Sequence, residues 1–388
     1  MFKDYKIKNF LSVSFVYISI YSATFNINAD SNLKSELLKK IAIGIPQWMD
    51  QQISKDLSHV PGEGITKRLI EETMKNSPAE IALYRIKDGV LSVHTTHAMS
   101  QDTKNLLCNP IAETLAELNS YVKLPDVEFL HFVWDSPSTG PNGAAFNAPH
   151  VIFSNYQIPV FASCKILEEK NVVLFPDPWT LKFIKDGSLD KTKLGNSTYP
   201  WSQKISKAIW RGMTTGGSYY KDIYQRFPRV KLVQLSNNFP EILDAKFNTI
   251  YGDYYVKSIF PQLNYMGETL PIEDHMQYKY QILIDGNSAP WTRGFWQLHC
   301  NSVILKQTSN YIQWYYELLK PYVHYIPFDY HCTDLIEKIR WAQNNEDKVL
   351  EIIKNANSVA ENCLQYSDIL LYMYAVINKY AKLQAFKP

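Results

Sequence analysis

The sequence predicts an α/β protein with two domains, and two observations carry that prediction. The chain has 388 residues, which is too long for one ordinary hydrophobic core and suits two domains of ordinary size. Residues 273–328 show a buried strand, a turn, an aromatic helix, a second apolar strand and a second aromatic helix. This β-turn-α-β-α order is typical of a parallel sheet covered by helices.

The composition describes a globular protein and excludes some classes of function. Hydrophobic residues make up 46% of the chain and charged residues 20%, which argues against disorder. Forty Lys and Arg against 38 Asp and Glu leave a net charge of +2. That balance argues against a protein that binds nucleic acid through a basic surface. Aromatic residues reach 14%, and they could stack on sugars or simply pack the core.

The cysteines predict neither a zinc site nor a complete set of disulfides. They are widely scattered, without a C-x-x-C pair or a Cys/His cluster at ligand spacing. Because their number is odd, buried free thiols are the default expectation. The five are Cys108, Cys164, Cys300, Cys332 and Cys363.

The first 30 residues have the anatomy of a signal peptide or a short membrane anchor. Lysines at positions 3, 6 and 8 precede an apolar-rich run over residues 10–25. The run is short for a bilayer span, so an amphipathic helix lying on a membrane or on the protein is an open alternative. A membrane-associated or secretory location is favoured, peripheral membrane association is allowed, and a cytoplasmic location stays open.

The next elements follow from periodicity. Residues 35–74 repeat apolar side chains at helical spacing, with a break at the Pro-Gly pair of residues 61–62. Residues 81–93 alternate as a strand or hairpin, and residues 109–121 return to a helical pattern. Residues 127–134, VEFLHFVW, predict a buried apolar strand.

Asp135 directly follows that strand and opens a loop rich in Ser, Pro and Gly that begins at Ser136. In α/β folds, catalytic groups lie at such strand ends. The alternative is that Asp135 caps the turn, which is a common use of Asp before Ser-Pro.

Residues 151–162 and 171–175 predict two further strands. The second leads into the turn Pro176-Asp177-Pro178-Trp179, where Trp179 could stack on a sugar or fill a core. Residues 182–202 are polar and contain two glycines, which predicts an interdomain linker.

A third strand end carries a candidate anion site. The short strand at residues 208–212 opens into Met213-Thr214-Thr215-Gly216-Gly217. Backbone N–H groups and hydroxyls can both donate hydrogen bonds there, and Arg211 adds a charge, so the pattern suits a pyrophosphate.

The strand at residues 278–284 ends similarly. It is followed by Asp285, Asn287 and Arg293, beside a glycine that lets a ligand approach the backbone. An isolated Arg after a strand is more often a surface salt-bridge partner than a phosphate ligand. Residues 334–360 and 369–383 then predict two amphipathic helices.

The order of these residues resembles that of the CAP10-like glycosyltransferases, glycosyltransferase family 90. This family includes protein O-glucosyltransferases of the secretory pathway and bacterial lipopolysaccharide glycosyltransferases. The matching residues are Tyr278-Lys279-Tyr280, Asp285-Gly286, Arg293, 302–306, Trp314, 319–327 and Asp334-Leu335, with Trp210-Arg211-Gly212 and, more faintly, Leu124-Pro125-Asp126 upstream.

The resemblance implies a GT-B-like fold of two Rossmann-like domains with a C-terminal helix packing back across both. The expected parts are a possible signal peptide or anchor (1–30), an acceptor-side domain (31–190), a nucleotide-sugar-binding domain (191–365) and a crossover helix (366–388).

The resemblance also implies roles for individual residues. Asp135 matches the family's catalytic base, although Trp134 stands before it where better-known members have Arg. A second arginine of the eukaryotic enzymes has no clear match, since Tyr219 or Lys221 falls near its position. Donor-binding candidates are Arg211, Gly212, Thr214, Thr215, Lys279, Asp285 and Arg293, and acceptor-side candidates are Ser136, Asp177 and Trp179.

The implied activity is transfer of a hexose or pentose, from a donor such as UDP-glucose or UDP-xylose, to a hydroxyl of a glycan, lipopolysaccharide or protein. One carboxylate base implies inversion. With no Asp-x-Asp triplet in the chain, we expect neither a metal nor a cofactor beyond the nucleotide sugar. The alternative is an inactive family member that binds nucleotide or glycan. A P-loop kinase is disfavoured because G-x-x-x-x-G-K-[ST] does not occur.

Overall fold

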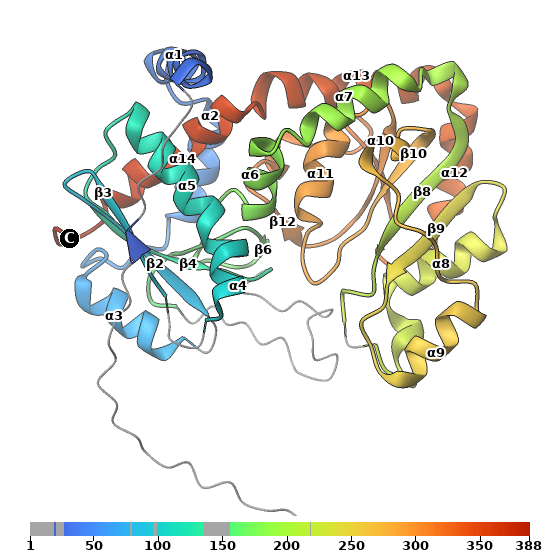
Figure 1. The fold of residues 1–388 in the computed structure, drawn as a ribbon, viewed down its shortest axis with the longest axis horizontal. Coiled ribbons are helices and arrows are strands. Elements are labelled where there is room, and N and C mark those ends of the chain that lie inside the picture. The colour runs from blue at the N-terminus through green and yellow to red at the C-terminus, as the bar shows by residue number, and fades with distance from the viewer. Residues whose placement is uncertain (1–18, 21–26, 78–79, 96–98, 136–155, 218) are drawn as a thin grey trace, which may run out of the picture.

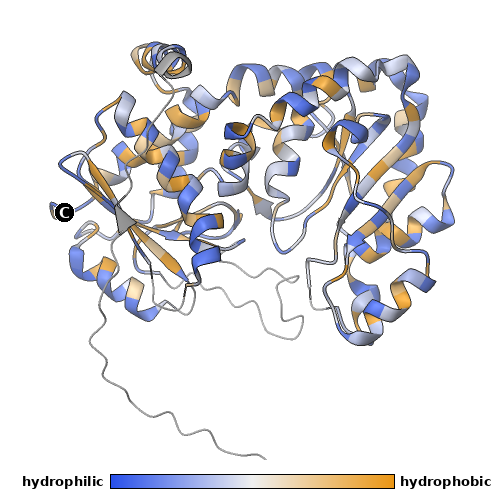
Figure 2. Ribbon diagram, in the orientation of Figure 1, coloured by the Kyte–Doolittle hydropathy of each residue, from blue (hydrophilic) through white to orange (hydrophobic). Residues whose placement is uncertain are grey.

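Two β-sheets, each with its own helices, form the two halves of the protein (Figure 1). The structure is a computed structural model that describes residues 19–20, 27–77, 80–95, 99–135, 156–217 and 219–388. Hydrophobic residues dominate the strands, and hydrophilic residues are frequent on the outer helices (Figure 2). This is the α/β, GT-B-like fold that the sequence predicts.

The sheet of the first half is mixed. In the described residues its order is β1-β3-β2-β4-β5-β7. The β1-β3, β3-β2 and β2-β4 pairs are antiparallel, whereas β4-β5 and β5-β7 are parallel. The strands are β1 (Ser19–Ile20), β2 (Ile81–Lys87), β3 (Val90–Thr95), β4 (Val127–Phe132), β5 (Val160–Ala162) and β7 (Val172–Leu174). Every residue of β4 is buried, so the predicted apolar strand before Asp135 is confirmed.

The sheet of the second half is entirely parallel, with the order β13-β11-β10-β8-β9. Its strands are β8 (Ile205–Met213), β9 (Leu243–Thr249), β10 (Tyr278–Leu283), β11 (Val303–Gln307) and β13 (Ile326–Phe328). If the five strands are numbered 1 to 5 along the chain, their order in the sheet is 2-1-3-4-5. The order in which successive strands are added reverses between β8 and β10. Ligands of doubly wound folds bind at that reversal, outside the carboxyl ends of the two strands.

Helices cover both sheets, and one small ribbon joins the halves. The ribbon pairs β6 (Lys165–Ile166) of the first half with β12 (Tyr311–Ile312) of the second. The α-helices are α1 (Ile27–Ile43), α2 (Gln47–Asp56), α3 (Lys67–Asn76), α4 (Gln101–Thr103), α5 (Asn109–Tyr121), α6 (Pro178–Lys185), α7 (Leu189–Thr198), α8 (Pro228–Asn238), α9 (Tyr254–Gln262), α10 (Ile272–His275), α11 (Trp291–Leu298), α12 (Leu335–Asn344), α13 (Glu346–Cys363) and α14 (Tyr366–Ala381). A π-helical turn, Lys104–Cys108, precedes α5, and 3₁₀ turns span Trp201–Gln203, Tyr224–Arg226 and Tyr316–Leu318.

The last two helices connect the halves. α13 packs on α11 and β11 of the second half, and α14 then packs on α1, α2, α5 and β4 of the first (Figure 1). The core of the first half also takes in Leu283, Phe295, Trp314 and Tyr315 from the second half. The crossing expected of the C-terminal helix is therefore made by α13 and α14 in succession, over a partly shared core.

Two segments have a secondary structure that the sequence analysis did not predict. The polar stretch 182–202, the expected interdomain linker, is mostly helical, as the end of α6 and all of α7. Gly195 is buried in α7 because α10 packs there; a Cβ would lie 2.5 Å from Met276 Cγ. The second aromatic helix of the 273–328 unit is absent as such, since residues 311–319 form β12 and a 3₁₀ turn that pack in the shared core.

The N-terminal prediction falls largely outside the described residues, and the domain limits stay predictions. Within the described part of the chain, no helix combines the length and apolar character needed to cross a bilayer.

Candidate active site

The candidate site lies between β8 and β10, where the strand order of the parallel sheet reverses. Two loops meet there, residues 214–217 after β8 and residues 285–287 after β10. The loops touch closely, because a Cβ on Gly216 would lie 2.9 Å from the Gly286 carbonyl oxygen. Gly216 also has φ +92°, a conformation that L side chains rarely adopt. Glycine at position 216 is therefore required by both backbone conformation and space.

Asp135 reaches this site from the first half. Its Oδ2 accepts a hydrogen bond of 3.0 Å from Asn287 Nδ2, across the two halves. Burial raises the pKa of Asp135, while the bond from Asn287 and the charge of Arg229 oppose that rise. A carboxylate with a raised pKa accepts a proton more readily at neutral pH, which suits a general base. The capping alternative concerns Ser136 onward, outside the described residues.

Arg229 was not among the predicted site residues. It lies in the first turn of α8 and ties both loops together through acceptors of the backbone and one hydroxyl. Its Nε donates to Asp285 O at 2.9 Å, and its Nη1 donates to Met213 O at 2.8 Å and to Thr215 Oγ1 at 2.6 Å. The guanidinium also lies 5.4 Å from the ring of Trp210. In the sequence Arg229 lies sixteen or so residues beyond β8, and that position alone does not indicate a role at the site. Only the fold shows its contacts.

Arg293 is a half-buried arginine whose charged end is only partly paired. In the first turn of α11, its Nη2 donates to the backbone oxygen of Arg211 at 2.6 Å. Its Nη1 is buried and has no hydrogen-bond acceptor among the described residues. Burial, and then the nearby charge of Arg229, lower the pKa of Arg293 to about 10. A buried N–H without an acceptor is costly, so the arrangement favours an incoming anion.

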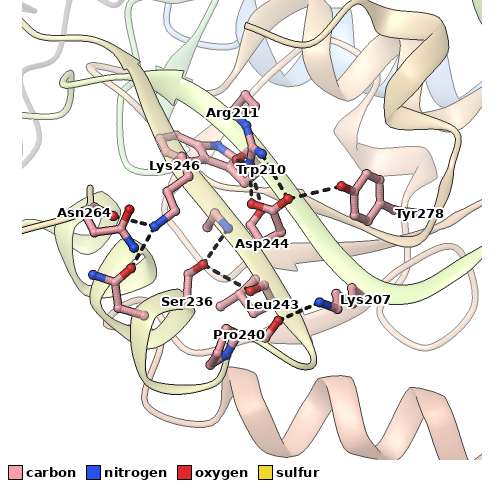
Figure 3. A network of polar contacts seen from close by, with 12 residues as sticks. Lys207, Trp210, Arg211, Ser236, Pro240, Leu243, Asp244, Lys246, Asn264 and Tyr278 are labelled. Atoms are coloured by element: carbon pink, nitrogen blue, oxygen red, sulfur yellow. Dashed lines mark hydrogen bonds and ion pairs between the residues drawn. The ribbon is translucent and has the colours of Figure 1, made fainter. Parts of the chain in front are cut away.

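Arg211, by contrast, is already paired. Its Nη1 and Nη2 lie 2.8 and 3.0 Å from Asp244 Oδ1 and Oδ2, and Tyr278 OH donates to the same carboxylate at 3.1 Å (Figure 3). The ion pair links β8 to β9, and the Arg211 side chain is 11% exposed. The structure thus gives Arg211 a structural partner instead of a free guanidinium for the donor.

The neighbouring predicted residues mostly shape the first loop. Gly212 is required by packing, since a Cβ would lie 2.5 Å from the Trp210 ring. Thr214 Oγ1 donates to Tyr251 O at 2.7 Å and accepts from Tyr251 N at 2.6 Å, so it fastens the loop to the chain after β9. Thr215 Oγ1 is the acceptor for Arg229. These side chains hold the loop, and the backbone N–H groups of Thr214, Thr215 and Gly216 already donate to Thr249 O, Met213 O and Asn287 Oδ1.

The structure brings Asp285 to the site but not Lys279. The backbone N–H of Asp285 is held by Gln307 Oε1 at 2.9 Å, and its Oδ2 is buried without a hydrogen-bond partner in the described residues. Burial raises the pKa of Asp285, opposed by the charges of Lys306 and Arg229. Lys279 lies near the start of β10, at the opposite end of the strand, and pairs with Glu346 at 3.0 Å. A strand places its two ends at opposite edges of the sheet, so Lys279 does not reach the donor loops.

The acceptor-side candidates have mixed placements. Ser136 lies outside the described residues. Asp177 is the N-cap of α6, because its Oδ1 accepts from Thr180 N at 2.8 Å, and burial raises its pKa to about 6. Trp179, in the first turn of α6, is 38% exposed and hence free to contact a ligand.

All five cysteines are free thiols, and all but the partly buried Cys363 are buried, which is the default expected from the sequence. In the described residues, no group of three or more His, Cys, Asp or Glu side chains is placed to hold a metal ion.

Comparisons with known proteins identify the family of this chain and several of its relatives. The glycosyl transferase family 90 model matches residues 46–388. Human protein O-glucosyltransferase 3 is 28% identical over 351 residues, covering 87% of this chain and 62% of that protein. Protein O-glucosyltransferase 2 of Danio rerio is 30% identical, covering 71% of this chain and 51% of that protein. The chain thus spans about half to three fifths of the length of these relatives.

Among solved structures, Anabaena HepE in complex with UDP-glucose is 14% identical, with a TM-score of 0.33, covering 60% of this chain and 65% of that one. A likeness of this size carries no argument about function. The family model matches far more than half of the sequence, including both strand-end loops, and the chain belongs to glycosyl transferase family 90.

Proposed function

We propose that this protein transfers a hexose or pentose from a nucleotide sugar to a hydroxyl of a protein, glycan or lipopolysaccharide. A donor of the UDP-glucose or UDP-xylose type is proposed, together with inversion at the sugar and no requirement for a metal. The family membership supports glycosyl transfer, and the names of the matched O-glucosyltransferases favour a glucose donor and a protein acceptor.

One observation carries the proposal: Arg293 presents a buried, unaccepted N–H at the carboxyl edge of a parallel sheet. Its neighbour Arg229 adds a second positive charge at the same edge. Asp244, which neutralises Arg211, accepts no hydrogen bond from Arg293. A diphosphate would supply the acceptor that Arg293 Nη1 lacks among the described residues, together with negative charge close to two arginines.

The chemistry requires two charge changes. The acceptor hydroxyl loses its proton to Asp135 as its oxygen forms the new bond to the sugar carbon. The bond from that carbon to the diphosphate oxygen breaks, and the leaving diphosphate gains negative charge. Arg293, with the positive charge of Arg229 nearby, would stabilise that charge, and such electrostatic stabilisation is usually the largest contribution in these sites. One base on the face opposite the leaving group gives inversion.

A donor screen by thermal shift tests the proposal. Wild type and Arg293→Met are melted with UDP, UDP-glucose, UDP-xylose and UDP-N-acetylglucosamine. Arg340→Met is the matched control, because Arg340 is an exposed arginine on α12 that stacks on Phe239 instead of facing the site. We expect a UDP-sugar to raise the melting temperature of wild type and of the control but not of Arg293→Met.

Release of sugar from the stabilising donor, in the presence of mixed protein and glycan acceptors, separates transfer from binding alone. A wild-type protein that no UDP nucleotide stabilises would contradict the donor site. Stabilisation without any transfer would instead favour the inactive, binding member of the family.

A further inference from the structure

We propose that Asn287 is a positioning residue, which orients the Asp135 carboxylate and couples it to the donor loop of the other half. This inference rests on the proposed function, because it concerns the same reaction. In the sequence, Asn287 stood out as a turn residue and, with Asp285 and Arg293, as part of the strand end where a ligand could bind. Its side chain does more than form a turn.

Both polar atoms of the Asn287 amide are used. Its Oδ1 accepts from the backbone N–H of Gly216 at 2.9 Å, and its Nδ2 donates to Asp135 Oδ2 at 3.0 Å. The amide orientation follows from chemistry, because a backbone N–H can only donate and a carboxylate can only accept. One side chain therefore joins the glycine turn after β8 to the carboxylate after β4.

The backbone that carries Asn287 is held on each side. Before it, the Asp285 carbonyl accepts from Arg229 Nε, and Gly286 N donates to Ser288 O at 3.0 Å. A Cβ on Gly286 would lie 2.7 Å from both Arg229 Nη2 and Thr215 Oγ1, so the turn is closely packed. The position of Asn287 is thus set by the second half, and Asp135 is placed relative to that half.

The exposure of Asn287 makes this arrangement informative. An exposed asparagine is free to form hydrogen bonds with water, yet this one spans two loops and two halves of the chain. A base must lie within hydrogen-bond reach of the proton it removes, and small displacements of such groups are costly to rate. Asn287 supplies a fixed contact for Asp135 from the half that holds the donor.

The electrostatic effect has a definite sign. Groups near the Asp135 carboxylate in the described residues are Asn287 after β10, Arg229 of α8 and the buried thiol of Cys164 after β5. Burial raises the pKa of Asp135, and the Asn287 bond and the Arg229 charge lower it. Removing the Asn287 donor raises the pKa further. Because a base works when deprotonated, the acid limb of the kcat/KM profile moves to higher pH.

Asn287→Ala and Asn287→Asp separate the two hydrogen bonds. Alanine removes both bonds, whereas aspartate keeps an acceptor for Gly216 and turns a carboxylate toward Asp135. Two adjacent carboxylates share a proton, so the acid limb should move furthest in Asn287→Asp. We expect kcat to fall by about 10-fold to 100-fold in both variants. Asn362→Ala is the control, since Asn362 is an exposed asparagine that bonds only within α13, to Ser358.

The test has readouts that a merely structural role would not move. If the wild type is active and its acid limb lies at the same pH as in Asn287→Ala, Asn287→Asp and Asn362→Ala, the positioning role is overturned, even if kcat falls. A ¹³C titration of the Asp135 carboxyl, identified by its loss in Asp135→Asn, measures the same shift without turnover. If Asp135→Asn retains full activity, Asp135 is not the catalytic base and that part of the proposed function fails, independently of any Asn287 variant. An unshifted carboxyl in Asn287→Ala overturns the inference alone.

Discussion

Replacing Arg293 with methionine should make the free protein more stable while removing its response to nucleotide. Arg293 is a half-buried cation whose Nη1 is buried without an acceptor among the described residues, and Arg229 lies nearby. Methionine has a similar length and no charge, so it leaves the packing volume largely filled. The two effects have opposite signs, which ordinary damage to the fold cannot produce.

The magnitude follows from the pKa. Burial and Arg229 lower the pKa of Arg293 from the usual value of an arginine to about 10. At about 1.4 kcal/mol per pH unit, the charged side chain costs the folded state roughly 3 kcal/mol. Because this folded pKa is depressed for a cation, the cost is fully present below pH 10 and disappears only above the unfolded pKa. Loss of the hydrogen bond to the Arg211 carbonyl destabilises the variant by about 1 to 2 kcal/mol. The free energy of unfolding should therefore rise by a net amount of about 1 to 2 kcal/mol.

Urea unfolding at pH 7.5, with and without saturating UDP, measures both effects. A ligand at 100 times its Kd stabilises the folded wild type by about 2.7 kcal/mol, and this increment should vanish in Arg293→Met. The reasoning is refuted if Arg293→Met is less stable than wild type and still gains stability from UDP. Then Arg293 would be an ordinary structural arginine.

Three further predictions follow from the placement of other residues. Arg211→Ala should lower the free energy of unfolding by about 2 kcal/mol, because it leaves Asp244 without its bidentate partner. The double variant with Asp244→Ala should recover part of that loss, and urea unfolding of the single and double variants measures both effects. Lys279→Ala should leave the donor KM unchanged and alter stability by less than about 1 kcal/mol, since Glu346, its partner, is exposed; a tenfold rise in donor KM would return Lys279 to the site. Sugar transfer should survive EDTA, and a complete loss that manganese restores would show that the donor site uses a metal.

The sequence predicted the parts of the fold and site that depend on local order. The edge of the sheet at which Asp135 lies could be predicted, because Asp135 follows a buried strand and the direction of that strand decides the edge. The paired glycines after β8 were visible as a loop that needs positive φ, and the Asp-Gly turn after β10 as a loop that needs space. Parallel pairing then brought the two loops together.

The remainder depends on contacts between residues far apart in the chain. Arg211 appears in the sequence as a free cation at a strand end, and only the pairing of β8 with β9 shows that Asp244 neutralises it. Arg229 has no local signal, since α8 must fold back before its guanidinium reaches both loops. Lys279 was placed with the site by its neighbours in sequence, although a strand separates it from the active edge. The helix within residues 182–202 was not predicted, because Gly195, needed for contact with α10, resembles a flexible glycine in the sequence.

The most direct test of the account is the kcat of Asp135→Asn. An asparagine can still accept the hydrogen bond from Asn287, so the contact between the halves and the melting temperature should be kept. The amide cannot take the acceptor proton, and general base catalysis is worth about 100-fold to 10,000-fold. We therefore predict a folded protein with wild-type donor affinity whose kcat is lower by that factor. A folded Asp135→Asn protein with near-normal kcat would contradict the assignment of Asp135 as the base.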